Sequence, residues 1–173
     1  SLTVNVVDDV PTVQDTIVQV QQGVLPRQNL VFVIDSSGSM AGEVKNVAAN
    51  GTVTIQNRLQ ATLQAVTAVI NEYFSQGGNV SITLIDFDDA ARNRGTFTTA
   101  ATAINALNNP ANFVIGGGTN YEAALTTAQA AIGTPVLGER YTTYFISDGA
   151  PTVGDTTDPA ANGYRAFATA NNI

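Results

Sequence analysis

The chain has 173 residues, enough for one full hydrophobic core, and 44% of them are hydrophobic, yet no apolar run is long enough to span a membrane. The net charge of -7 and the single lysine, Lys45, leave no basic patch that could follow a phosphate backbone, so nucleic-acid binding is not expected. Histidine and cysteine are both absent, which excludes imidazole bases, thiol nucleophiles and the usual zinc ligands.

The first 27 residues are expected to lie outside the main domain. Residues 1–10 alternate apolar and polar side chains, as in the last strand of a preceding β-rich module, and residues 11–27 are predicted to be a linker or an extra strand. The carboxylates of Asp8 and Asp9 fit either a calcium site at the joint between modules or a solvated turn, and both interpretations stay open. Because the chain begins at Ser1 without a Met or a signal-peptide pattern, we expect it to be a piece of a longer protein.

A short apolar run, residues 30–34, ends abruptly at Asp35, which is followed by Ser36, Ser37, Gly38 and Ser39. Such a run predicts a strand buried on both faces, as in a parallel sheet. Function in open α/β sheets gathers beyond the carboxyl ends of the strands. One carboxylate and three hydroxyls follow this strand, and oxygen ligands of this kind suit a hard divalent cation, Mg²⁺ above all.

The next segments alternate between strands and helices. Residues 41–57 contain an Asn-Gly pair typical of a tight turn and are predicted to form a small hairpin. Residues 58–76 carry apolar side chains at helical spacing, so they are predicted to be a helix that packs on the sheet. Residues 80–87 are the next predicted strand, with a threonine-rich continuation through residues 94–98.

Two polar clusters have structural interpretations. Asp86, Asp88 and Asp89 lack the glycine and the spacing of a calcium loop, so they are predicted to form a solvated turn. Three glycines precede Thr119, which has capping-box spacing with Glu122 and, taken alone, has the structural role of a helix cap. These glycines could cradle a phosphate, but no lysine follows them in the pattern of a nucleotide loop.

The remaining segments continue the alternation. Residues 99–109 and the segment after Asn120 are predicted to be helices, residues 140–146 a strand, and residues 162–173 the start of another helix. Asp148 lies in an Asp-Gly pair directly after the strand, which taken alone indicates a turn. The whole pattern predicts a doubly wound, mostly parallel α/β sheet flanked by helices.

Three of these motifs occur together in a fixed order, and together they resemble the von Willebrand factor A family, which has a Rossmann-like fold. The resemblance covers residues 28–173, and its matching segments are residues 35–40, 118–120 and 147–149. In that family the equivalent residues form a metal-ion-dependent adhesion site. The residues that the resemblance places there are Asp35, Ser37, Ser39, Thr119 and Asp148.

The resemblance implies a role for each of these residues. Ser37 and Ser39 would bind the cation directly through their hydroxyls, and Thr119 would join them in the binding-competent state. Asp35 and Asp148 would act through water or switch between direct and indirect contact. The expected cation is Mg²⁺, with Mn²⁺ or Ca²⁺ as alternatives, and neutral hydroxyls would leave it electrophilic enough to attract a partner's carboxylate.

We therefore expect an extracellular, divalent-cation-dependent binding module of a large bacterial RTX-type surface adhesin. Its partner would be a protein or matrix ligand that presents an acidic group, alongside the neighbouring domains of the same adhesin. The alternative is a structural spacer whose metal site is vestigial or only stabilising. Catalysis is not expected, because the chain has no histidine, cysteine or nucleotide-binding lysine, and Lys45 lies six residues past Ser39, a poor match to a Ser-Lys hydrolase.

The family pattern also predicts more chain than is present. In the family, one or two further strands and a closing helix follow the segment that ends here at Ile173. On the order of thirty to fifty residues would therefore be missing, and we expect a C-terminally truncated domain with an unprotected sheet edge.

Overall fold

A computed structural model describes residues 25–154 and 163–173. The predicted β-rich segment 1–10, with Asp8 and Asp9, and nearly all of the predicted linker lie outside the described residues. The elements, in chain order, are β1 (Gln28–Asp35), the 3₁₀ turn η1 (Gly38–Ala41), β2 (Glu43–Val47), β3 (Val53–Asn57), α1 (Arg58–Ser75), β4 (Val80–Phe87), β5 (Ala91–Phe97), α2 (Ala100–Leu107), α3 (Tyr121–Ile132), β6 (Arg140–Ile146) and α4 (Tyr164–Asn171).

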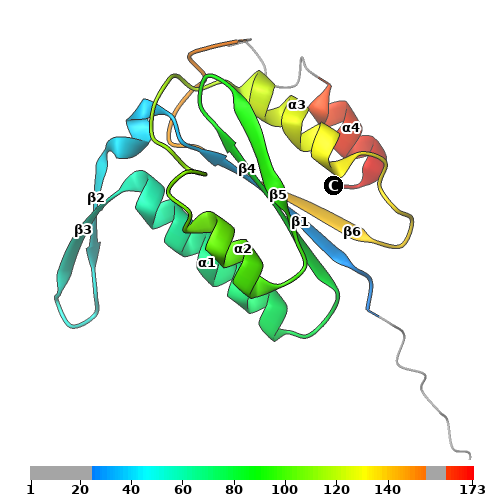
Figure 1. Cartoon of the computed structure of the whole chain (residues 1–173), viewed down its shortest axis with the longest axis horizontal. Coiled ribbons are helices and arrows are strands. Elements are labelled where there is room, and N and C mark those ends of the chain that lie inside the picture. Colours follow the sequence, from blue (N-terminus) through cyan, green and yellow to red (C-terminus); the bar gives the residue numbers. More distant parts are fainter. Residues whose placement is uncertain (1–24, 155–162) are drawn as a thin grey trace, which may run out of the picture.

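The main sheet has four strands in the order β5-β4-β1-β6, in which β4, β1 and β6 run parallel to one another. The central strand β1 pairs with β4 on one side and β6 on the other, so that Ile34 lies level with Asp86 and with Ile146. Helices α1 and α2 cover one face and α3 and α4 cover the other (Figure 1). This arrangement confirms the predicted mostly parallel α/β sheet, and it brings the carboxyl ends of β1, β4 and β6 to one edge.

The core forms on both faces of β1 because its apolar run alternates between them. Leu30, Phe32 and Ile34 pack with the residues of α1 and α2, whereas Val31 and Val33 pack against α3. All five are at most 3% exposed. Burial of each such side chain stabilises the fold by about 1.5–3 kcal/mol. The well-packed strand β1 therefore gives the turn that follows Asp35 a rigid support.

The predicted hairpin is present as the β2–β3 ribbon, a separate two-stranded antiparallel sheet. It projects from the body of the molecule beside η1 (Figure 1). Its base is closed where the Arg58 backbone N–H donates to the Gly42 carbonyl over 2.8 Å. Val47, Val53 and Ile55 on the ribbon are each more than half exposed.

One strand differs from the sequence expectation. Residues 94–98 were expected to continue the strand 80–87, but residues 91–97 form a separate strand, β5, which pairs antiparallel with β4 at the edge of the sheet. The chain reverses at the turn after β4, where the Asp88 N–H donates to the Ala90 carbonyl over 2.9 Å. Among the described residues, no helix is both long and apolar enough to cross a lipid bilayer.

Candidate metal site

The carboxylate of Asp35 lies at the end of β1 and holds two distant segments together. Asp35 is fully buried. Its Oδ1 accepts a hydrogen bond of 2.7 Å from the Ser37 N–H, and its Oδ2 accepts one of 2.5 Å from the Ser147 hydroxyl. The first bond turns the chain sharply into η1, and the second joins the ends of β1 and β6.

The hydroxyls of Ser37 and Ser39 lie side by side in this turn. Their Oγ atoms are 3.1 Å apart, and the Ser39 hydroxyl donates to Asp148 Oδ1 over 2.6 Å. Ser37 is buried and Ser39 is exposed, so the two hydroxyls lie at the boundary between the interior and the surface. The turn motif after β1 and the Asp-Gly motif after β6, separate in the sequence, are therefore in direct contact.

The loop that carries Thr119 reaches the same turn through the backbone. The Gly38 N–H donates to the Gly117 carbonyl over 3.1 Å, and the Gly116 N–H donates to the Ser36 carbonyl over 2.9 Å. Ser37, Ser39 and Thr119 line one pocket of about 320 Å³, together with glycines of both loops and Thr152. The structure thus brings the three predicted hydroxyls to one place, with Asp35 and Asp148 beside them.

The predicted capping role of Thr119 is wrong. Asn120 is the N-cap of α3, and its side chain accepts a hydrogen bond of 3.0 Å from the Ala123 N–H. Thr119 itself is 5% exposed, and within the described part of the chain its hydroxyl makes no hydrogen bond. Helix capping is thus done by its neighbour, and Thr119 lines the pocket without using its hydroxyl in the cap.

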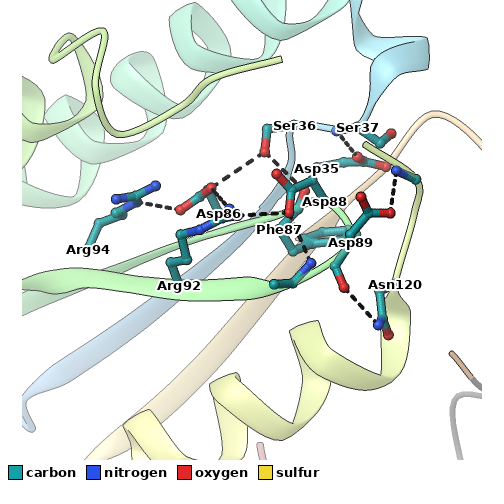
Figure 2. A network of polar contacts seen from close by, with 12 residues as sticks. Asp35, Ser36, Ser37, Asp86, Phe87, Asp88, Asp89, Arg92, Arg94 and Asn120 are labelled. Atoms are coloured by element: carbon teal, nitrogen blue, oxygen red, sulfur yellow. Dashed lines mark hydrogen bonds and ion pairs between the residues drawn. The ribbon is translucent and has the colours of Figure 1, made fainter. Parts of the chain in front are cut away.

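The prediction of a solvated turn at residues 86–89 is wrong for Asp86. Figure 2 shows this carboxylate between two arginines of β5, and it is only 1% exposed. Arg92 Nη1 lies 3.1 Å from Asp86 Oδ2, and Arg94 Nε donates to Asp86 Oδ1. A buried carboxylate must be paired, and the antiparallel return of β5 supplies the partners.

The same turn supports the Thr119 loop. Asp89 Oδ1 accepts a hydrogen bond of 2.7 Å from the Gly118 N–H, and the Asp89 carbonyl accepts one of 3.0 Å from the Asn120 amide (Figure 2). The Asn120 N–H also donates to the Asp88 carbonyl over 2.9 Å. A glycine is required at position 117, because φ there is +65° and an added Cβ would lie 2.6 Å from Asp89 Oδ2. The turn after β4 thus holds both neighbours of Thr119, Gly118 and Asn120, in place by hydrogen bonds.

Arg58, the first residue of α1, also belongs to the site, and no motif indicated it. Its Nη1 lies 2.5 Å from Asp148 Oδ2 and 3.5 Å from the Ser39 carbonyl oxygen. The guanidinium passes close to Gly42, where an added Cβ would lie 3.0 Å from Arg58 Cζ. Partial burial raises the pKa of the Asp148 carboxyl, but the hydrogen bonds from Ser39 and Arg58 and the arginine charge outweigh burial, so this pKa is lower than usual.

The donor set fits a hard cation that binds oxygen. Three hydroxyls and two carboxylates meet at one edge of the sheet, and hydroxyl, carboxylate and water oxygens are the ligands that Mg²⁺ and Ca²⁺ take. In the described ranges no three or more His, Cys, Asp or Glu side chains gather as a metal cluster. The site would therefore depend on serine and threonine, and the ligand roles of the five residues stay predictions.

Comparisons with known proteins place the chain in context. A family model described as "von Willebrand factor type A domain" matches residues 30–150. That range contains all five predicted ligands and the Arg58, Asp86 and Asp89 side chains described above. No curated protein sequence matches the chain.

Several solved structures share the fold. The PilB minor pilin from Streptococcus sanguinis aligns with a TM-score of 0.61 and 22% identity over 75% of this chain and 31% of its own. The vWF domain of the type V pili tip protein Mfa5 from Porphyromonas gingivalis aligns with a TM-score of 0.56 and 18% identity, over 74% of this chain and 39% of its own. The conserved hypothetical protein BatB from Bacteroides thetaiotaomicron aligns with a TM-score of 0.58 and 19% identity, over 86% of this chain and 63% of its own. The chain thus spans less than two thirds of each, and the likeness concerns the fold.

Proposed function

Since the chain belongs to the von Willebrand factor type A domain family, we propose that it is a divalent-cation-dependent binding module whose metal site consists of Asp35, Ser37, Ser39, Thr119 and Asp148. One observation carries the proposal. Ser37, Ser39 and Thr119 line a single pocket although they come from two distant loops, and Asp148 accepts a 2.6 Å hydrogen bond from Ser39.

The two carboxylates have anchored positions that suit indirect contact with a cation. Asp35 is held by the Ser37 N–H and the Ser147 hydroxyl, and Asp148 is held by Ser39 and Arg58. The neutral hydroxyls would then supply the direct protein ligands. A bound cation would supply an electrophilic position for the carboxylate of a partner, because hydroxyls offset little of its charge. Mg²⁺ is the preferred candidate, with Mn²⁺ and Ca²⁺ as alternatives.

We further propose an extracellular location, as part of a large bacterial surface adhesin of the RTX type. The support is that similar folds occur in a minor pilin and in a pilus tip protein, both parts of longer chains. The partner would be a protein or matrix ligand with an exposed Asp or Glu side chain. No enzymatic activity is proposed, since the sequence contains neither histidine nor cysteine.

A structural spacer is the second candidate, and one observation favours it. The chain of contacts from Ser37 through Ser39 and Asp148 to Arg58 already pairs these side chains with one another. The site therefore holds its shape through protein contacts, as a module selected only for rigidity would.

Calorimetric titration with Mn²⁺ tests the proposal. The wild type should bind one Mn²⁺ per chain, and Asp35→Ala and Ser39→Ala should abolish the binding heat. Glu72→Ala is the matched control, because it removes an exposed carboxylate from the far end of α1. Equal heats for wild type and Asp35→Ala would refute the assignment. Binding of Mn²⁺ together with adhesion to matrix proteins that is insensitive to chelator would favour the spacer.

A further inference from the structure

Arg58 lies where helix electrostatics alone would disfavour it. It is the first residue of α1, and the N-terminal end of a helix carries a partial positive charge that repels a cation. It is nevertheless held there by Asp148, 90 residues away, through a 2.5 Å contact. Gly42 leaves room for the guanidinium, which an added Cβ would crowd. Such a placement indicates that the charge serves the site.

We propose that Arg58 is a specificity-determining residue, a permanent second cation that weakens metal binding and strengthens binding of the partner's carboxylate. This inference rests on the proposed function. Asp148 Oδ2 is bound to Arg58 and only Oδ1 is turned toward the serines, so half of that carboxylate is withheld from a metal. With Asp35 and Asp148 as its two anions, a site loaded with a divalent cation would be neutral without Arg58 and carries a net charge of +1 with it.

Arg58 is also accessible to a partner. Its side chain is 44% exposed, whereas Asp148 beneath it is 13% exposed. A pocket of about 250 Å³, lined by Arg58, Asp148, Met40, Val44 and Ile146 among others, opens beside it. Within the described residues only Nη1 of the guanidinium has a hydrogen-bond partner, so its other N–H donors are not engaged there and belong to the planar donor set that carboxylates match. The ligand chemistry is thus an acidic side chain that contacts both the metal and Arg58.

The test compares Arg58→Gln, Arg58→Lys and Arg140→Gln. Arg140→Gln is the matched charge control, because Arg140 is exposed at the opposite end of β6. Mn²⁺ affinity is measured by calorimetry, and acetate is the anion probe, its binding read from the loss of Mn²⁺-bound water in proton relaxation. Arg58→Gln should bind Mn²⁺ roughly three- to tenfold more tightly and acetate more weakly by a similar factor. In Mn²⁺ affinity Arg58→Lys should stay near wild type, since it keeps the charge, whereas its acetate affinity should fall, since it lacks the planar donors.

The outcomes separate the two proposals. If Arg58→Gln equals Arg140→Gln in both affinities, or binds Mn²⁺ more weakly, the role of Arg58 is refuted while the metal site stands. Equal effects of Arg58→Gln and Arg58→Lys on Mn²⁺ affinity would also refute it, because the effect would then come from packing and not from charge. If neither wild type nor Asp35→Ala binds Mn²⁺, both proposals fail together. Circular dichroism of each variant checks that the fold is retained.

Discussion

The Ser147 hydroxyl donates a hydrogen bond of 2.5 Å to the buried Asp35 carboxylate, although 112 residues separate the two in the chain. Tyr121 extends this link, because its hydroxyl donates to Ser147 Oγ over 2.9 Å and also contacts the Gly149 carbonyl. The end of β1, the end of β6 and the start of α3 are thereby joined at one carboxylate. The candidate site is therefore a product of tertiary structure, and each of these links can be tested.

Removal of the Ser147 hydroxyl should be costly. Ser147→Ala leaves a buried, charged oxygen of Asp35 without its donor, so we expect a loss of about 1.5–3 kcal/mol in the free energy of unfolding. Ser81→Ala is the control, because its 2.7 Å hydrogen bond goes to the neutral Asn29 side chain and should be worth about 1 kcal/mol. Urea denaturation measures both. Equal losses would show that the Asp35 contact has no special strength.

Thr119 and Asn120 should separate binding from stability. Asn120→Ala removes the cap of α3 and should cost about 0.5–2 kcal/mol. Thr119→Val keeps the shape and removes a hydroxyl that bonds to no described residue, so stability should change by less than about 0.5 kcal/mol while Mn²⁺ affinity falls at least roughly tenfold. Urea denaturation and calorimetry decide. A Thr119→Val variant that is as destabilised as Asn120→Ala would contradict the assignment of the cap.

Asp86 should matter to stability far more than its neighbour Asp88. Asp86→Asn leaves Arg92 and Arg94 facing a neutral, buried amide, and we expect a loss of about 2–4 kcal/mol, moderated because both arginines are partly exposed. Asp88→Asn breaks only the more exposed pair with Arg92 and should cost under about 1 kcal/mol. Thermal unfolding of the two variants checks the difference, and a larger effect of Asp88→Asn would contradict it.

Metal binding should stabilise the folded chain. The predicted ligands come from three distant segments, so an unfolded chain has no site, and Mg²⁺ at one hundred times its dissociation constant should add about 2.7 kcal/mol. The measurement is the melting temperature with Mg²⁺ and with a chelator. Ser39→Ala should melt at the same temperature in both, and an equal rise in that variant would point to binding elsewhere.

Tyr144 should titrate unusually late in alkaline solution. Its hydrogen bond with Tyr73, its burial and the proximity of the Tyr73 charge raise its pKa to about 12. Since the unfolded value is about 10, the resulting stabilisation is complete below about pH 10 and is lost as the pH rises toward about 12. Tyrosinate absorbance should show a late phase that Tyr144→Phe removes. In Tyr73→Phe that phase should move to lower pH, and an unchanged phase would refute this cause.

The elements that could be predicted are those whose sequence contains a local pattern typical of a strand, a helix or a turn. The apolar run of β1, the helical spacing of α1 and the Asn-Gly turn of the β2–β3 ribbon are local patterns, and each element formed as expected. The return of β5 was not predictable in the same way, because the turn expected at residues 86–89 does not by itself show that the chain reverses there into a separate antiparallel strand. Its register decides that Arg92 and Arg94 meet Asp86, and register is a property of the assembled sheet.

The site shows the same division. The positions of Asp35, Ser37, Ser39, Thr119 and Asp148 follow from motifs and from the rule that strand ends share an edge. Arg58 could not be found that way, because only folding brings the first residue of a helix to a carboxylate 90 residues later. The misassigned cap reflects a one-residue ambiguity: Thr119 and Asn120 both suit an N-cap, and the bonds of Asn120 to Ala123 and Asp89 decide in its favour.

The β2–β3 ribbon is joined to the body at its base, where the Arg58 N–H donates to the Gly42 carbonyl and Asn57, the last residue of β3, caps α1. The outer part of the ribbon, from the pair Val47–Val53 to the turn, lies beyond these contacts, so it can change in length or sequence without altering the start of α1. The ribbon therefore offers a contact surface beside Arg58, where Val44 lines the pocket, and its outer part can vary while the ends of β1 and β6 keep their geometry.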